Sequence, residues 1–430
     1  MEWQIGLSKK YKECEVVKMA KGYRILAQGC QMSNDTRETG RNNNDLIIGP
    51  SGAGKTRGYV MPNILQGNES MIVADCKGNL RKQMGGALKE QGFKVIQIDF
   101  TNCSLSYGYN PFDFIRYDKE RQCYLEQDIM TVAASIVPQT RSISDPFWDL
   151  AARFYLESFI AYILECLPER EHSLDMAVRL FAEMGTGRFE KLMSELEELN
   201  PESFAVSRYN MYKGNEKAEK MHESIRGILA EKMSVFAFDG AKRMFHSKRR
   251  IDFAELGREK IAVFLNVSDT DRSMDKLVNL FYTQALQCLC YSADKNYNSK
   301  LKIPVRLILD DFAAGTLIPD FDKIISVIRS REIAVSIILQ SISQLEGLYG
   351  HAKALTIINN CDSCLYLGGQ DVETARYIST KANKSINSIL DMPLDRAWLF
   401  VRGQEGRQVK RYDVKMHRKY SQLPECKMGG

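Results

Sequence analysis

Residues 49–56 read GPSGAGKT and match the pattern GxxxxGK[ST] in full. An apolar run, DLIIGP at 45–50, leads into them, and TRGYVMPNIL at 56–65 has the character of a helix. This strand–loop–helix context is what a phosphate-binding P-loop requires. Its glycines let backbone N–H groups close around phosphate oxygens, and the helix N-terminus adds partial positive charge. The loop therefore restricts the chain to an α/β fold.

Short apolar runs alternate with helical patterns on both sides of the loop. This alternation predicts a doubly wound, mostly parallel sheet with helices on both faces. We also expect a short strand at 23–29 and a hairpin at 397–414 with its turn near 403–406. The predicted strands of the sheet lie at 45–50, 70–75, 93–100, 260–267, 304–312, 334–341 and 363–368.

A different pattern separates the two runs of strands. Helix formers dominate from about 119 to 240, as in FEKLMSELEEL. The chain has 430 residues, which is too long for one ordinary core. We predict an N-terminal segment at 1–22, a nucleotide-binding domain in two parts at 23–140 and 251–430, and an inserted all-α domain at 141–250.

The P-loop predicts ATP and Mg²⁺ as cofactors. Lys55 is expected to contact the β- and γ-phosphates, and the Thr56 hydroxyl to bind Mg²⁺. We expect nucleotide contacts along the whole loop, from Gly49, Pro50, Ser51, Gly52, Ala53, Gly54, Lys55, Thr56 and Arg57.

LILDDFA at 307–313 supplies the acidic half of the site. Asp310 ends an apolar strand, so its carboxylate is expected to hold Mg²⁺ through water. Asp311 would then point at the attacking water, where many motor ATPases carry the longer glutamate. The alternative is that both aspartates only cap the end of a strand.

Two further residues are candidates for coupling hydrolysis to movement. Gln340 ends the strand after the one that carries Asp311, where an amide can sense the γ-phosphate. Arg329 lies near the end of the preceding helix and is our candidate for an arginine finger in a neighbouring subunit, with Arg331 as its competitor. A solvated helix end is the alternative for both arginines.

A P-loop alone fits a kinase, a switch or a motor. A kinase would use its inserted domain as a lid over the phosphates. The additional strand expected between the P-loop strand and the Asp310 strand favours a motor that hydrolyses ATP at subunit interfaces.

The longest apolar stretch, at 147–167, is long enough to span a bilayer, but Asp149, Arg153, Glu157 and Glu165 interrupt it. We interpret it as a buried helix and expect a chain without a transmembrane segment or signal peptide. Its eleven cysteines then indicate reduced thiols in a cytoplasmic protein. Cys361 and Cys364 form a single CxxC, which we interpret as core rather than as a metal or redox site.

Several motifs together carry a resemblance to a family. IIGPSGAGKT, VADCKGNL, YGYNPFDFI, DPFWD, LILDDFA and the stretch from FDKIISVIRSRE to NNCDSCLYLGG resemble the coupling proteins of conjugative type IV secretion systems, of the TraG/TraD type. The similarity runs from about 23 to 415 and is nearest to members from Gram-positive integrative elements.

The resemblance implies a RecA- and FtsK-like ATPase that forms a homo-hexamer. It implies that a relaxase-bound single DNA strand is received and passed to the secretion channel at the cytoplasmic face of the membrane. By family pattern Lys55, Thr56, Asp310, Gln340 and Arg329 match the P-loop lysine and hydroxyl, the Walker B acid, the sensor glutamine and the trans arginine. Asp75 matches an acidic residue after the second strand.

Two features depart from the family. Asp311 stands where most members have glutamate, which predicts slower turnover. Members usually carry transmembrane helices before the nucleotide domain, and we find none in this sequence. We expect either that the chain is a truncated or naturally soluble form or that a separate membrane subunit docks it. An isolated monomer is the alternative to the hexamer.

The net charge of +5 permits DNA binding without demanding it. The candidate DNA contacts are two basic clusters, at 241–250 and 407–419, for which a solvated surface is the alternative. Two other functions remain open: a translocase or helicase without a channel partner, and a nucleotide-dependent docking platform with little turnover.

Overall fold

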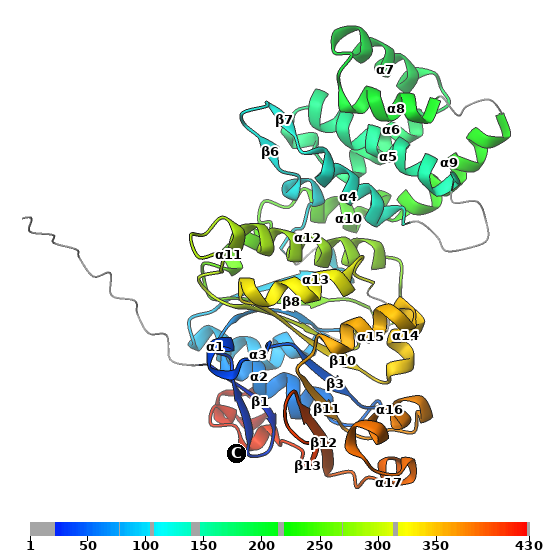
Figure 1. Cartoon of the computed structure of the whole chain (residues 1–430). Coiled ribbons are helices and arrows are strands. Elements are labelled where there is room, and N and C mark those ends of the chain that lie inside the picture. The colour runs from blue at the N-terminus through cyan, green and yellow to red at the C-terminus, as the bar shows by residue number, and fades with distance from the viewer. Residues whose placement is uncertain are drawn as a thin grey trace, which may run out of the picture.

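The computed structural model describes residues 22–76, 78–103, 107–138, 147–213, 219–268, 270–312 and 317–427. In these ranges the chain forms one large sheet with helices on both faces, and a separate group of helices stands at one end (Figure 1). This architecture confirms the predicted doubly wound, mostly parallel sheet with an α-helical insertion.

The large sheet has nine strands in the order β13-β12-β11-β3-β10-β9-β4-β8-β5. From β11 to β5 every neighbouring pair is parallel, and β12 and β13 add an antiparallel hairpin at one edge. The strands are β3 (Asp45–Ile48), β4 (Ser70–Ala74), β5 (Lys94–Asp99), β8 (Ile261–Asn266), β9 (Val305–Leu309), β10 (Ile333–Leu339), β11 (Ser363–Tyr366), β12 (Arg396–Val401) and β13 (Arg407–Lys410).

The strand expected at 23–29 lies outside this sheet. It is β1 (Tyr23–Ala27), which pairs only with β2 (Cys30–Ser33) in an antiparallel hairpin. A third small sheet joins β6 (Tyr117–Asp118) to β7 (Cys123–Tyr124).

The additional strand that distinguishes the motor class is present. β10 lies between β3, which leads into the P-loop, and β9, which leads into Asp310. Ile337 of β10 is opposite Leu46 on one side and Leu309 on the other. The carboxyl ends of the three strands therefore meet at one edge of the sheet.

Alternate residues of the central strands pack on opposite faces, because successive side chains of a strand point to opposite sides. Leu46 and Ile48 of β3 enter the larger core, and Ile47 enters the smaller one. The smaller core is closed by α2 and α3, while the larger one runs through α12 to α15 and continues into the helical group. Both faces are thus buried, as near-continuous apolar strands predict.

Helices connect the parallel strands, as the alternating pattern predicts. The helices are α1 (Thr36–Thr39), α2 (Met61–Gln66), α3 (Asn79–Glu90), α4 (Glu126–Ile136), α5 (Phe147–Cys166), α6 (Leu174–Glu183), α7 (Arg188–Leu199), α8 (Phe204–Lys213), α9 (Glu219–Met233), α10 (Asp239–Phe245), α11 (Phe253–Leu256), α12 (Asp275–Asp294), α13 (Phe321–Val327), α14 (Ile342–Tyr349), α15 (His351–Asn359), α16 (Val372–Ala382), α17 (Ile386–Leu390) and α18 (Pro424–Lys427).

Helices α5 to α10 make up most of the group at the top of Figure 1. Their central helix is α5, the apolar stretch that could have been a membrane span. Its buried Glu157 pairs with Arg208 at 3.3 Å, and Glu165 accepts a hydrogen bond from Ser203 at 2.5 Å. The buried Glu157 thus has a cation beside it inside the bundle. Among the described residues we find no helix that could span a bilayer.

The helical group meets the sheet-bearing part through α4, which contacts both α5 and α12. The division at 141 and 250 stays a prediction. The chain leaves the group after α10 and returns to the sheet with β8.

The helix after the P-loop departs from a regular α-helix. It begins as a π-helix, η1 (Thr56–Val60), in which the Met61 N–H donates to the Thr56 carbonyl, and it continues as α2. Pro62 explains the wider turn, because it has no N–H to donate and its ring crowds the carbonyl four residues earlier. π-helical turns are frequent at functional sites.

Candidate nucleotide site

The P-loop leaves the sheet at the end of β3 and turns into η1. Its entry is fixed by the Gly49 N–H, which donates to the Leu339 carbonyl at 3.1 Å. A Cβ at Gly49 would lie 2.9 Å from the Cβ of Leu367, so only glycine fits. Gly52 and Gly54 have φ of 78° and 82°, in the left-handed region that favours glycine.

Lys55 lies inside the curl of this loop. Its ammonium donates to the carbonyls of Gly49 and Pro50 at 2.6 and 3.0 Å, and the residue is only 7% exposed. Burial lowers the pKa of Lys55, and the carboxylates of Asp311 and Asp310 oppose that effect. The loop thus holds a cation in its centre with no ion pair to any described carboxylate.

The acidic half of the site meets the P-loop directly. Thr56 Oγ1 donates to Asp310 Oδ2 at 3.0 Å, although the two residues are 254 positions apart. Asp310 follows β9 and Thr56 opens η1, so the contact depends on β9 and β3 ending at the same edge of the sheet. The alternative that Asp310 only caps a strand end does not explain this contact.

Asp311 and Gln340 lie beside this pair. Gln340 Nε2 is 3.5 Å from Asp311 Oδ1, the long limit of a hydrogen bond. Asp311 has φ of 50°, a left-handed conformation that aspartate tolerates better than most residues. The backbone N–H of Asp311 donates to Asp310 Oδ1 at 3.2 Å, so the turn that orients one carboxylate also supports the other.

Burial raises the pKa of Asp310 to about 6, and the neighbouring charge of Asp311 adds to this effect. The hydrogen bond from Thr56 and the charge of Lys55 act in the opposite direction without cancelling it. The negative charge of Asp310 is therefore only partly stabilised by its neighbours, and a bound cation would stabilise it further.

These features fit a magnesium nucleotide. The left-handed glycines and the first turn of η1 present N–H groups to an anion, Lys55 adds a positive charge, and Thr56 and Asp310 offer oxygen ligands of the kind Mg²⁺ prefers. Five of the predicted residues therefore lie together: Lys55, Thr56, Asp310, Asp311 and Gln340.

Five of the predicted loop residues are exposed: Pro50, Ser51, Gly52, Gly54 and Arg57. Pro50 and Ser51 lie at the tip of the loop. The Arg57 side chain makes a two-pronged ion pair with Glu425 of α18, at 3.0 and 3.1 Å. The Arg57 guanidinium therefore binds the C-terminal end of the described chain.

Arg329 is far from the P-loop of its own subunit. It lies in the 3₁₀ turn η7 (Ile328–Arg331), just before β10, whereas Gln340 follows that strand. Seven strand residues span about 23 Å. Arg329 is exposed and its guanidinium has no hydrogen bond or ion pair within the described ranges, whereas Arg331 is bound by Asp294 at 2.8 and 3.0 Å.

Asp75 has a structural contact. Its carboxylate accepts the backbone N–H groups of Leu80 and Arg81, at 3.1 and 2.9 Å, in the first turn of α3. This is the geometry of a helix cap, which satisfies N–H groups that have no partner inside the helix.

A buried charge network supports the helix that follows the loop. Tyr59 of η1 donates to Asp45 Oδ2 at 2.6 Å, and Arg24 Nε donates to the other oxygen at 3.0 Å. Arg306 of β9 joins the network through the Ser336 hydroxyl at 3.1 Å. The network ties β1, β3, β9 and β10 to the first turn after the P-loop.

Sequence reasoning missed one residue at the site. Arg411 follows β13 and donates to the P-loop carbonyl of Ala53 at 2.8 Å. In the sequence Arg411 is recognisable only as a member of the basic cluster at 407–419, which is a candidate DNA contact. Lys419 in the same cluster is bound by the carbonyls of Leu65 and Gln66.

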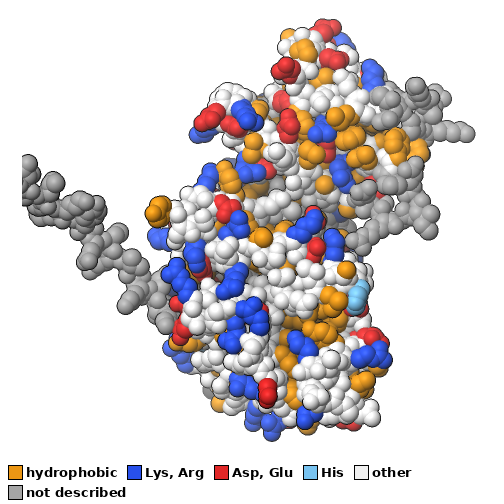
Figure 2. Space-filling view, viewed as in Figure 1, with side chains coloured by type: hydrophobic (Ala, Val, Ile, Leu, Met, Phe, Trp, Pro, Cys, Tyr) orange, Lys and Arg blue, Asp and Glu red, His pale blue; other side chains and the backbone are white. Residues whose placement is uncertain are grey.

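Figure 2 shows Lys and Arg side chains gathered on the visible face of the sheet-bearing part. In the other basic cluster, Lys248 and Arg249 are exposed, whereas Arg250 pairs with Asp113 at 2.6 Å. Tyr209 and Tyr212 are buried in the helical group, so they pack in the core and do not face solvent.

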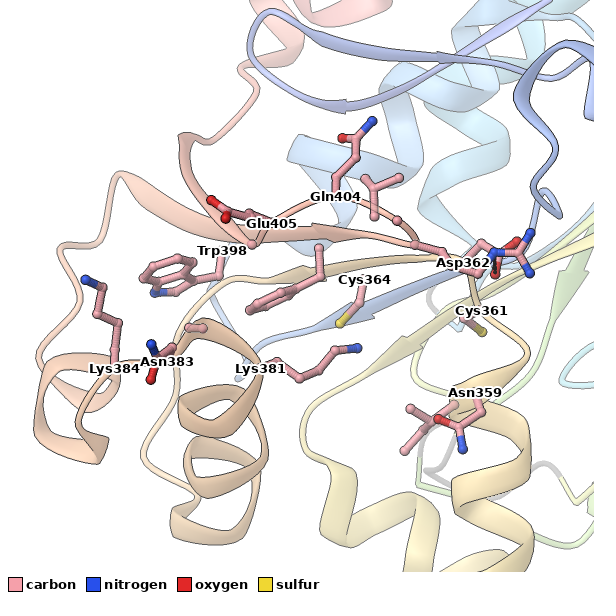
Figure 3. Close-up of a pocket in the computed structure, with 17 residues that line it drawn as sticks. Asn359, Cys361, Asp362, Cys364, Lys381, Asn383, Lys384, Trp398, Gln404 and Glu405 are labelled. Carbon is pink, nitrogen blue, oxygen red and sulfur yellow. Dashed lines mark ion pairs between the residues drawn. The ribbon is translucent and has the colours of Figure 1, made fainter.

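A cavity of about 650 Å³ lies away from the P-loop, between α15, α16, β12 and the hairpin turn. Figure 3 shows Lys381 reaching from α16 toward Cys364 on β11. Cys364 is buried and the Cys361 thiol donates to the Ile357 carbonyl. No group of three or more metal-ligating side chains occurs in the part of the chain described here.

Comparison with known proteins gives a family. A family model described as "Type IV secretory system Conjugative DNA transfer" matches residues 8–385. VirD4 of Rhizobium rhizogenes is 26% identical over 351 residues, which are 79% of this chain and 49% of VirD4. TraG of Escherichia coli is 22% identical over 357 residues, which are 78% of this chain and 54% of TraG. The chain thus spans about half the length of these curated relatives.

Solved structures share the fold. The plasmid coupling protein TrwB, in complex with a non-hydrolysable GTP analogue, superposes with a TM-score of 0.68 at 18% identity, covering 93% of this chain and 92% of TrwB. VirB4 of Thermoanaerobacter pseudethanolicus gives 0.56 at 14% identity, with coverage of 94% and 99%. With the family model matching most of its length, the chain belongs to the type IV secretory family of conjugative DNA transfer, the coupling proteins of the P-loop ATPase class that its sequence resembles.

Proposed function

We propose that this chain hydrolyses ATP and uses the energy to deliver a relaxase-bound single DNA strand to a type IV secretion channel. The observation that carries the proposal is the contact between Thr56 and Asp310, made at the edge where β3, β10 and β9 end together. That contact brings a hydroxyl and a carboxylate of two distant segments close enough to bind one Mg²⁺ together. Family membership supports the DNA-transfer part.

Magnesium nucleotide binding is the first step we assign. Lys55 leaves the Gly49 and Pro50 carbonyls and turns to the β- and γ-phosphates, while Thr56 and Asp310 hold Mg²⁺. When bound, Mg²⁺ neutralises charge that develops on the phosphate oxygens. The structures of TrwB with ATP and GTP analogues and with ADP and Mg²⁺ support this assignment.

We assign the hydrolysis step to Asp311 and Gln340. The Asp311 carboxylate accepts a proton from the attacking water, and the Gln340 amide, 3.5 Å away, keeps that carboxylate oriented and senses the γ-phosphate. Gln340 ends β10, so a change at the phosphate can be passed along this central strand toward η7.

Assembly follows from the position of Arg329. It is exposed at the opposite end of β10 from the site of its own subunit, so we propose that it reaches the nucleotide of a neighbour in a homo-hexameric ring. Its lack of a described partner leaves the guanidinium available for this role. The isolated chain is expected to be monomeric at low concentration.

Substrate recognition is assigned to the helical domain at 141–250. Most of it stands at one end of the sheet-bearing part in Figure 1, where it can receive a protein partner. The membrane channel, or a separate membrane subunit, would then hold the ring at the cytoplasmic face.

ATPase assays test the proposal. Turnover is measured with an oligothymidine strand and a cognate relaxase, at concentrations at which negative-stain images show rings. We expect stimulated turnover in the wild type and none in Lys55→Ala. Background turnover in the presence of rings would refute the motor.

Asp311 favours one second candidate, a docking platform that binds nucleotide and substrate but turns over little. Aspartate is one methylene shorter than the glutamate used by many motors, so water must sit closer to it or be bridged. Relaxase binding that depends on MgATP but continues without hydrolysis would support the platform over the motor.

A further inference from the structure

The C-terminal segment 411–427, called here the C-terminal arm, is built around the helix that follows the P-loop. Val414 and Leu423 are fully buried in the same core as Tyr59 and Ile64. A Cβ at Gly58 would lie 3.2 Å from the Tyr412 carbonyl oxygen, so the arm approaches the helix backbone closely. The arm is therefore part of the surroundings of the nucleotide site.

Three cationic contacts join the arm to this region. Lys419 donates to the Leu65 and Gln66 carbonyls at the end of α2, at 3.0 and 3.1 Å. Glu425 receives Arg57, as described above. The third contact, from Arg411, is the one that touches the phosphate-binding loop itself.

Arg411 is bound entirely by backbone carbonyls. Its Nη1 donates to Ala53 at 2.8 Å, Nη2 to Leu367 at 2.6 Å and Nε to Arg396 at 2.9 Å. The planar guanidinium is thus fixed at once by the residue after β11, by the first residue of β12 and by the P-loop. A lysine could not reproduce this fork, because its ammonium is a single point of donation.

The Ala53 contact determines where the next N–H points. The peptide group between Ala53 and Gly54 is planar and trans, so its carbonyl and its N–H point in opposite directions. Arg411 holds the carbonyl on the side of the arm, and the Gly54 N–H consequently points away from the arm. No described residue accepts a hydrogen bond from that N–H.

A glycine at this position needs such a restraint. Gly54 has φ of 82°, and glycine populates both signs of φ with similar ease, so the loop by itself does not select one orientation of this peptide. Backbone N–H groups in a P-loop are the donors that bind phosphate oxygens. A donor whose orientation is already fixed does not have to be reoriented when the phosphate enters.

We propose that Arg411 is a positioning residue that presets the Gly54 N–H for a phosphate oxygen, so that the C-terminal arm sets the affinity of the site for nucleotide. The proposal rests on the nucleotide binding proposed above. It assigns Arg411 no contact with nucleotide.

Arg411 also lines a cavity of about 280 Å³ between the P-loop and the arm, with Asp395 and Tyr412. A direct contact between Arg411 and the nucleoside is therefore the competing role. The two roles differ in ligand dependence. Loss of a positioned phosphate donor should weaken the binding of every phosphate ligand by the same factor. Loss of a nucleoside contact should leave the binding of pyrophosphate unchanged.

Calorimetric titration of the full chain with MgADP, MgGDP and magnesium pyrophosphate separates them. For Arg411→Ala we expect all three dissociation constants to rise by a common factor of about 10 to 100, the equivalent of one charge-assisted hydrogen bond. Arg411→Lys keeps the charge and the stem, and should recover less than half of the loss on a logarithmic scale. It also serves as the test if the alanine variant does not fold.

Lys419→Ala is the matched control. It releases the same arm at a site that does not touch the P-loop, so its melting temperature should fall while all three affinities stay within about twofold. Lys55→Ala should abolish binding, and its failure to do so would refute the nucleotide site rather than the role of Arg411. Unchanged affinities in Arg411→Ala, an equal loss in Lys419→Ala, or a loss confined to MgADP and MgGDP would each overturn the proposal.

Discussion

The ionised carboxylate of Asp310 should lower the free energy of unfolding of the nucleotide-free protein, compared with a neutral side chain of the same shape. Burial, reinforced by the neighbouring Asp311, raises its pKa from an ordinary 3.8 to about 6. A carboxyl group whose pKa is higher in the folded state stabilises the fold fully below 3.8, and that contribution is lost as the pH rises through 6. The substitution Asp310→Asn removes the charge and keeps the shape.

The magnitude follows from these two values. At pH 8 the ionised carboxylate costs about 3 kcal/mol relative to a neutral group of the same shape, and at pH 5 about half of that. We therefore expect Asp310→Asn to be more stable than the wild type at pH 8 by up to about 3 kcal/mol, with the advantage shrinking toward pH 4. A gain of this size should raise the melting temperature by at least about 3 °C.

Thermal unfolding of both proteins from pH 4 to pH 8, without nucleotide or divalent cation, measures this difference. Adding MgADP should reverse the order, because only the wild type retains the carboxylate that Mg²⁺ requires. A variant that is less stable than the wild type at pH 8, or whose difference does not change with pH, would refute the reasoning.

Asp99 offers a control of opposite sign. It also ends a strand of the sheet, but hydrogen bonds lower its pKa although burial alone would raise it. They come from the Asn266 side chain, from Thr101 through both its hydroxyl and its N–H, and from the Asn102 N–H, the contacts of Thr101 and Asn102 being 2.7 to 2.9 Å long. Asp99→Asn should therefore destabilise the protein at pH 8, and this loss should shrink as the pH falls toward 3.

The other predictions concern single side chains. Lys55→Ala should lose nucleotide binding in calorimetry while its circular dichroism stays that of the wild type; retained binding would contradict the site. Asp311→Asn should lower ATP turnover by about 10² to 10⁴ with MgADP affinity unchanged, and an unaffected rate would remove its role as base. Arg329→Ala should bind ATP without hydrolysing it, and mixing it with Asp310→Asn should restore part of the activity, whereas no rescue would argue against a contact in trans. Asp45→Ala leaves the buried guanidinium of Arg24 without a carboxylate and leaves Arg306 with Glu69 alone, so urea denaturation should report a loss of about 3 to 5 kcal/mol, and a loss below 1 kcal/mol would contradict the network.

Much of the fold could be predicted because it depends on local sequence patterns, such as apolar runs and glycine positions. The apolar runs at β3, β4, β5, β8, β9, β10 and β11 are strands in the structure, since a parallel strand buried on both faces needs apolar residues along its length. The P-loop could be recognised for the same kind of reason: its glycines are required by local backbone angles and close approach. The interpretation of 147–167 as a bundle helix also held, because its charges needed polar partners.

Neighbouring residues could not reveal which segments would meet. The strand at 23–27 looks like the others, yet it pairs outside the main sheet, because strand pairing depends on competition among all edges. The Arg57 side chain, assigned to the nucleotide by its place in the loop, lies against Glu425 instead. In the basic cluster at 407–419, Arg411 and Lys419 donate to backbone carbonyls, which the charge pattern alone does not indicate.

The sequence by itself determined the P-loop, the parallel-sheet class and the order of helices and strands, because these follow from periodicity and backbone preferences within a few residues. Only the tertiary structure decided that Thr56 meets Asp310, that Arg329 lies at the opposite end of β10 from the site, and that Arg411 binds the loop from 358 residues away. Such meetings depend on strand order, which is set by how the whole core packs.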